Sequence, residues 1–246
     1  MDILLRAVGR GFLPALLRVF TDNTLGVVDP GIYPADWRWG RVYEGDLYDA
    51  LWQWRGISVG ENYDFSTQCP NPNCRKKMDF TYAVSEVARK PIPEVVLANL
   101  REGRNRISAD FSGGSFVFII PTADESQALA NTSTKRASAI HQRGAAQADE
   151  TDTSLIKSLR QKLMSVTVEG TTYEGGKLDR WLDEIDLDIG GEIIDIIEEN
   201  SFGIDTAVDL VCGNCGGTFP GEIPMQKSFF LSRGSRRPDL SPTKTQ

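Results

Sequence analysis

The sequence predicts an α+β fold in which two β-hairpins, near residues 63–84 and 206–225, flank a large insertion of mixed helices and strands. In both hairpin stretches, apolar and polar residues alternate on either side of a turn-rich loop, which is the pattern of half-buried strands. Between the hairpins, apolar residues recur at helical spacing in 154–165 and 177–200. The 246 residues are enough for one or two domains with a sizeable core.

An apolar helical leader is expected over residues 1–40. Its apolar side chains, Phe12 and Leu16 among them, can share one face of a helix, although Gly9 and Pro14 weaken helix formation. Such a helix either packs on the following domain or acts as an arm that docks on a partner or a membrane surface.

Four of the five tryptophans crowd around the end of this leader and the segment after it: Trp37, Trp39, Trp52 and Trp54. Core packing is one use for them. Tryptophan is also favoured as an anchor of protein interfaces, so the cluster, together with Phe12 and Leu16, is a candidate partner-binding surface.

Three local patterns define further elements. Residues 44–56 have the apolar spacing of a helix, with Asp46 as its expected cap. Residues 115–120 form a short apolar run that indicates a buried strand. Thr122 and Glu125 then make a capping box, so a helix is expected to begin there.

Residues 177–200 contain two amphipathic helical stretches, which the sequence places on either side of Gly190-Gly191. The span 178–209 carries eleven acidic residues and one basic residue. Such a charge run is typical of a solvated face; a docking site for a basic partner is the alternative. Residues 131–153 fit either an exposed helix or a loose linker.

The predicted domain organisation has three parts. Residues 1–40 are the leader or docking arm, and residues 41–231 form a single α+β domain that contains both hairpins. Residues 232–246 are polar, basic and proline-bearing, which predicts a disordered tail.

All four cysteines lie in the two hairpin loops, as Cys69 and Cys74 in the first and Cys212 and Cys215 in the second. Structural zinc takes four tetrahedral ligands, commonly thiolates with two to four residues between partners. The lone histidine, His141, is far from either loop. The sequence therefore predicts a split four-cysteine zinc ribbon, in which a structural Zn²⁺ is held by every cysteine of the chain.

Other uses of these cysteines stay open. A thioredoxin-like redox pair normally opens a helix, whereas Cys212 and Cys215 lie between predicted strands. Two disulfides fit a reducing compartment poorly. An iron–sulfur cluster could also use four thiolates, although nothing in the sequence favours one.

Composition and motifs exclude several classes of function. The net charge of −7 opposes a general grip on nucleic-acid phosphates. The sequence contains no P-loop and no GxSxG elbow, and with one histidine it offers no catalytic triad. We therefore expect no enzyme, no nucleic-acid partner and no membrane span. The alternative is a zinc-ribbon nucleic-acid accessory factor, for which Arg75, Lys76 and Lys77 beside Cys74 are the best support.

Several motifs together resemble a known family. "AVDLV" is followed by Cys212-Gly-Asn-Cys215, then "EIPM", then Phe229-Phe230, and "FVFIIPTADESQAL" lies upstream. Over residues 41–231 the chain resembles the bacteriophage baseplate family typified by T-even phage hub subunits and hub assembly proteins.

That resemblance implies a non-enzymatic structural or assembly role in the hub of a contractile-tail baseplate. The implied partners are hub proteins and the tape-measure protein. The implied location is the host cytoplasm during assembly, or the baseplate of the virion tail. The leader and the Trp37–Trp54 region are then expected to face the partner.

Overall fold

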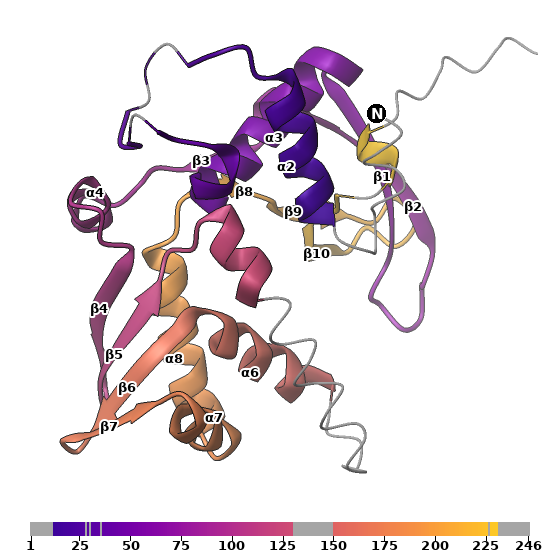
Figure 1. Ribbon diagram of the computed structural model, residues 1–246. Coiled ribbons are helices and arrows are strands. Elements are labelled where there is room, and N and C mark those ends of the chain that lie inside the picture. Colours follow the sequence, from indigo (N-terminus) through magenta and orange to yellow (C-terminus); the bar gives the residue numbers. More distant parts are fainter. Residues whose placement is uncertain are drawn as a thin grey trace, which may run out of the picture. The chain divides into compact units, whose positions relative to one another are not determined.

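The computed structural model describes residues 12–27, 29, 31–34, 36–129, 150–225 and 227–230. Among these residues the chain forms two compact units. The hairpin unit contains residues 12–15, 49–89 and 204–230, and the sheet unit contains residues 16–48 and 90–203. Both combine helices with small antiparallel sheets, so the α+β class is confirmed (Figure 1).

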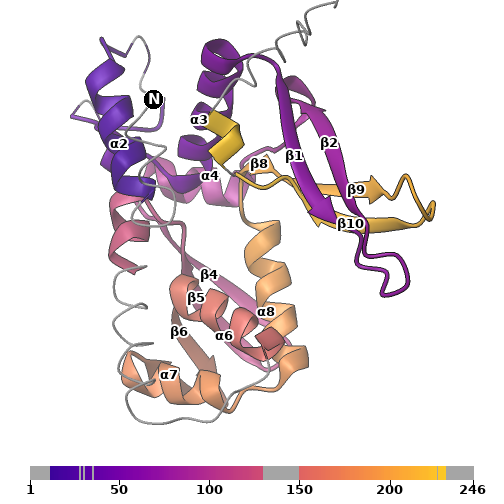
Figure 2. The same cartoon turned by 90° about the vertical axis from the view of Figure 1, so that its right-hand side faces the viewer.

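Two antiparallel hairpins form the hairpin unit (Figure 2). Each hairpin closes where the sequence predicts it. The strands are β1 (Asn62–Gln68) with β2 (Lys77–Ala83), and β9 (Ala207–Val211) with β10 (Thr218–Glu222). The short strands β3 (Ala88–Lys90) and β8 (Gly203–Asp205) also pair with each other.

Aromatic residues make the core of the hairpin unit. Tyr63 and Phe65 point inward from β1, in keeping with the alternation of a strand. The Tyr63 ring contacts those of Trp52 in α3 (Glu44–Val59) and Phe229 in the short helix η3 (Lys227–Phe230), and the Phe65 ring contacts that of Tyr63. The Trp52 and Phe229 rings are 4.8 Å apart and nearly perpendicular, the edge-to-face geometry that aromatic pairs favour.

A four-stranded antiparallel sheet in the order β4-β5-β6-β7 forms the centre of the sheet unit. Beside it, helix α6 packs against both α7 and α8 (Figure 1). Phe116, Phe118 and Val166 of the sheet meet Leu182 and Ile193 of the helices in one apolar core. The strands are β4 (Arg106–Phe111), β5 (Gly114–Ile119), β6 (Leu163–Val168) and β7 (Thr171–Glu174), and the helices are α4 (Glu94–Arg101), α6 (Glu150–Lys162), α7 (Gly176–Asp183) and α8 (Leu187–Glu199).

The predicted capping box is present. The Thr122 backbone N–H donates to Glu125 Oε2 at 2.9 Å, and the Glu125 N–H donates back to Thr122 Oγ1 at 3.4 Å. Residues 123–129 are helical. This reciprocal pair satisfies two N–H groups that a helix start leaves without partners.

Two boundary predictions are wrong. Asp46 does not cap its helix: α3 begins at Glu44, and Asp46 instead accepts a hydrogen bond from the Tyr33 hydroxyl. The break between the amphipathic helices does not fall at Gly190-Gly191 either, because both glycines lie within α8. Asp186 caps α8 by accepting from the Asp188 N–H at 3.0 Å.

Gly190 has a packing role that explains the second error. A Cβ at this position would lie 2.8 Å from Leu155 Cδ2 of α6. The missing side chain therefore lets two helices approach closely, and it does not end one.

Only part of the predicted leader falls within the described residues. Helix α2 spans Phe12–Asn23, and Leu16, Val19 and Phe20 in it are buried. Residues 1–11, the side chain of Phe12, most of 131–153 and the tail at 232–246 lie outside the described part. No described helix is both long and apolar enough to cross a membrane.

Candidate metal centre

The two hairpin loops hold their cysteines through backbone hydrogen bonds. In the first loop the Cys69 N–H donates to the Lys76 carbonyl at 3.0 Å, and the Cys74 N–H donates to the Asn71 carbonyl at 2.9 Å. In the second loop the Gly216 N–H donates to the Cys212 carbonyl at 2.8 Å. Gly216 has a φ of 70°, a conformation that favours glycine, so the CGNCG sequence suits this tight turn.

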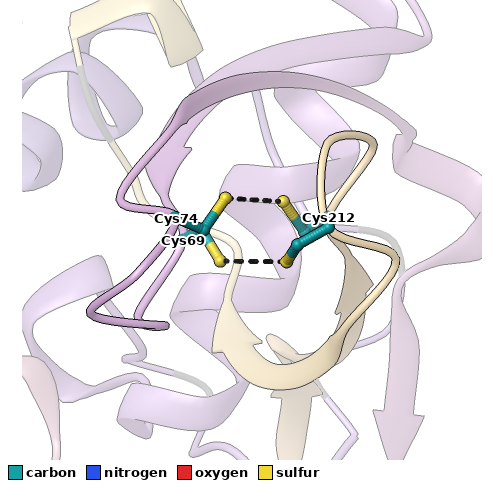
Figure 3. Close-up of side chains that lie close together, drawn as sticks. Cys69, Cys74 and Cys212 are labelled. Carbon is teal, nitrogen blue, oxygen red and sulfur yellow. Dashed lines mark hydrogen bonds between the residues drawn. The ribbon is translucent and has the colours of Figure 1, made fainter.

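The loops bring all four thiols together (Figure 3). Cys69 Sγ lies 3.8 Å from Cys215 Sγ, and Cys74 Sγ lies 3.7 Å from Cys212 Sγ. All four sulfur atoms lie within 4.8 Å of one another. The sequence-predicted ligand set is therefore assembled, with members up to 146 residues apart.

These distances fit a single metal ion better than disulfides. Four sulfurs at about 2.3 Å from one tetrahedral ion are about 3.8 Å from each other. A disulfide would need about 2.05 Å, and all four cysteines are free. Cys69 and Cys212 are buried, Cys74 is half-buried and Cys215 is exposed, so the cluster lies at the edge of the hairpin unit's core.

Hydrogen bonds lower the pKa of two of the four thiols below the ordinary value, and burial raises the pKa of a third. The N–H groups of Cys215 and Asn214 lower the pKa of the Cys212 thiol to about 6. The Lys76 N–H, helped by the Asn214 side chain, lowers the pKa of Cys74. Burial raises the pKa of Cys69 to about 12. A cysteine binds metal as the thiolate. Cys212 therefore loses its proton easily, whereas at Cys69 a metal ion must displace a tightly held proton.

The six residues predicted to bind a partner are divided between the two units. Trp37 and Trp39 lie in the sheet unit, and their rings are 5.4 Å apart at nearly right angles. Trp39 Nε1 also donates to Thr24 Oγ1 at 2.8 Å. Both rings are half-buried, which leaves part of each accessible.

Two of the other predicted contact residues are inaccessible, and the side chain of Phe12 lies outside the described part. Trp52 and Leu16 have 0% exposure, and Trp54 is half-buried in α3. Trp52 belongs to the aromatic core of the hairpin unit.

Arg55 is a structurally important residue outside the set predicted from the sequence. It is only 2% exposed and donates to backbone carbonyl oxygens of Gly60, Asn62 and Phe229. Its position four residues after Leu51, on the apolar side of α3, is the signal that could have indicated it.

A protein-family model described as "T4 bacteriophage base plate protein" matches residues 38–231. The chain belongs to this family. The match covers most of the chain and includes both cysteine pairs, so the resemblance to T-even phage baseplate proteins is confirmed. No curated protein and no solved structure matches the chain. Membership in this baseplate family supports a structural role in the phage tail and favours a non-enzymatic function.

Proposed function

We propose that this baseplate protein acts at the hub of a contractile tail, as a structural or assembly component that docks on hub proteins and the tape-measure protein. The family match over residues 38–231 is the observation that carries the proposal. The chain would be made in the host cytoplasm and would act there during tail assembly.

We also propose that the four cysteines hold a structural Zn²⁺. The donor set is four sulfurs at the spacing of one tetrahedral ion, and such a set leaves no coordination position for a substrate. Zinc would link the tip of β1–β2 to the tip of β9–β10 within the hairpin unit. In small zinc modules such binding contributes on the order of 10 kcal/mol to folding.

We propose that the partner surface consists of the leader and the region from Trp37 to Trp54. The proposed organisation of the chain is a leader (1–40), a zinc-linked domain (41–231) and a disordered tail (232–246). Trp37 and Trp39 support this best, because they are large, adjacent and partly accessible. Leu16 and Trp52 are fully buried, so each would contribute only by packing within its own unit.

An affinity pull-down of the tagged chain from phage-producing cells tests the proposal. Hub and tape-measure proteins should be recovered with the full chain and lost when residues 1–36 are deleted. A matched tryptophan control is available: Trp37→Ala should weaken recovery, whereas Trp181→Ala, which removes a half-buried ring of the sheet unit, should not. Unchanged recovery after the deletion would remove the leader from the proposed surface.

The same experiment addresses the nucleic-acid alternative. Arg75, Lys76 and Lys77 are exposed beside Cys74. If they bind phosphate, the chain should recover nucleic acid in a salt-dependent way and should recover no tail proteins.

A further inference from the structure

One side chain connects the two cysteine loops directly. Asn214 lies between Cys212 and Cys215 in the second loop, and its Nδ2 donates to Cys74 Sγ of the first loop at 3.4 Å. The two residues are 140 positions apart in the sequence. The hydrogen bond therefore crosses from one hairpin to the other.

The Asn214 donor belongs to a side chain, whereas the other hydrogen-bond donors described at the cysteine sulfurs, apart from the thiols themselves, are backbone N–H groups. Cys212 is served by the backbone N–H groups of Asn214 and Cys215, and Cys74 by that of Lys76. Almost any residue supplies a backbone N–H. The carboxamide N–H of Asn214 depends on its side chain, so the sequence can gain or lose it by a single substitution.

Such a donor matters to a metal-bound thiolate for two reasons. It orients the sulfur toward the ion, and it stabilises the negative charge that remains on a four-thiolate site. Removal of outer contacts of this kind typically weakens metal binding by about 10- to 100-fold.

We propose that Asn214 is a positioning residue of the metal centre, whose side-chain hydrogen bond holds the Cys74 sulfur in ligating orientation across the two hairpins. This inference rests on the proposed four-cysteine metal site. Asn214 itself does not ligate the ion.

A simple turn-forming role makes a different prediction. Asn and Asp both favour tight turns, so Asn214→Asp should be harmless if only the turn matters. An aspartate at this position keeps the size of the side chain but loses the N–H donor. It also adds a negative charge beside the thiolates.

The test uses the full chain with Co²⁺ and Zn²⁺ as probes. Wild type, Asn214→Ala and Asn214→Asp are titrated with each metal, in competition with a chromogenic chelator, and the cobalt–thiolate absorption bands are recorded. Asn73→Ala is the matched control: it removes an exposed asparagine of the first loop whose side chain makes no hydrogen bond to a sulfur among the described residues.

The expected result is metal binding weaker by about 10- to 100-fold in Asn214→Ala, weaker still in Asn214→Asp, and unchanged in Asn73→Ala. The cobalt bands should shift in the Asn214 variants alone. Wild-type affinity and spectrum in Asn214→Asp would overturn the positioning role while leaving the metal site intact. If wild type binds neither metal, the proposed zinc site fails and this inference fails with it.

Discussion

Replacing Arg55 with methionine should release the C-terminal segment from the core of the hairpin unit. The buried guanidinium donates from Nε to the Phe229 carbonyl at 3.1 Å and from Nη2 to the Asn62 carbonyl at 2.7 Å, and Nη1 donates to Gly60. Its Cζ also lies 5.2 Å from the ring centroid of Tyr63 and 5.5 Å from that of Phe229, within the range of cation–π attraction.

The expected loss of stability depends on which of the three carbonyl groups can find another hydrogen-bond donor. Methionine keeps the apolar stem but has no donor. Gly60 and Asn62 are exposed residues, so water can replace the lost donors there, whereas Phe229 is fully buried. A buried acceptor without a partner costs about 1–3 kcal/mol, and loss of the cation–π contacts adds about 1 kcal/mol. The buried guanidinium also carries a desolvation cost, which lowers the pKa of Arg55. Methionine removes this cost, and that offsets part of the loss.

We therefore expect Arg55→Met to lower the free energy of unfolding by about 2–3 kcal/mol. The measurement is equilibrium urea unfolding followed by tryptophan fluorescence, since the Trp52 ring lies 4.8 Å from that of Phe229. Arg89→Met is the control in the same unit: Arg89 Nε is 2.8 Å from Asp49 Oδ1, but its side chain is 46% exposed. Exposed ion pairs contribute at most about 1 kcal/mol. Equal losses in the two variants would refute this account of Arg55.

Three further predictions concern the cysteines, a close backbone approach and a buried carboxyl group. The Cys212→Ser variant should fail to hold the metal and should have lower solubility and thermal stability, but no catalytic reaction should be abolished. A soluble variant of full stability would exclude a structural zinc. Gly45→Ala should destabilise the sheet unit by about 2 kcal/mol or more, because its Cβ would lie 2.3 Å from the Phe202 carbonyl oxygen. In the control Gly191→Ala, the added Cβ in α8 meets nothing within 4 Å, so the free energy of unfolding should rise by about 0.5–1 kcal/mol. Urea unfolding that gave both changes the same sign would contradict this packing. Burial raises the pKa of Glu44 above its ordinary 4.5, so the native state binds the proton more tightly than the unfolded state and stability should fall as the pH rises from 4.5 through the raised pKa. Glu44→Gln should flatten that part of the pH–stability curve, and an unchanged curve would show that Glu44 does not contribute to it.

The hairpins and their cysteines could be predicted because their signals are local. Tyr63 and Phe65 alternate at the period of a strand, and two cysteine pairs that use every cysteine leave few other assignments. The capping box of Thr122 and Glu125 is local in the same sense, since both partners lie within one helical turn.

The remaining features depend on contacts that sequence spacing does not encode. Gly190 has the same local signature whether it ends a helix or admits Leu155 of α6. Arg55 lies at helical spacing from Leu51, but arginine is rarely buried, so its interior position depends on carbonyl groups that other parts of the chain supply. The Asn214–Cys74 hydrogen bond exists only once two distant loops meet.

Quantitative mass spectrometry of purified phage particles and of their baseplate assembly intermediates is the strongest test of a structural or assembly role in the baseplate. We expect the chain to be present in one or both fractions, in a fixed ratio to the hub proteins. Its absence from particles and intermediates alike, in cells that produce infectious phage and contain the chain, would contradict a structural or assembly role in the baseplate.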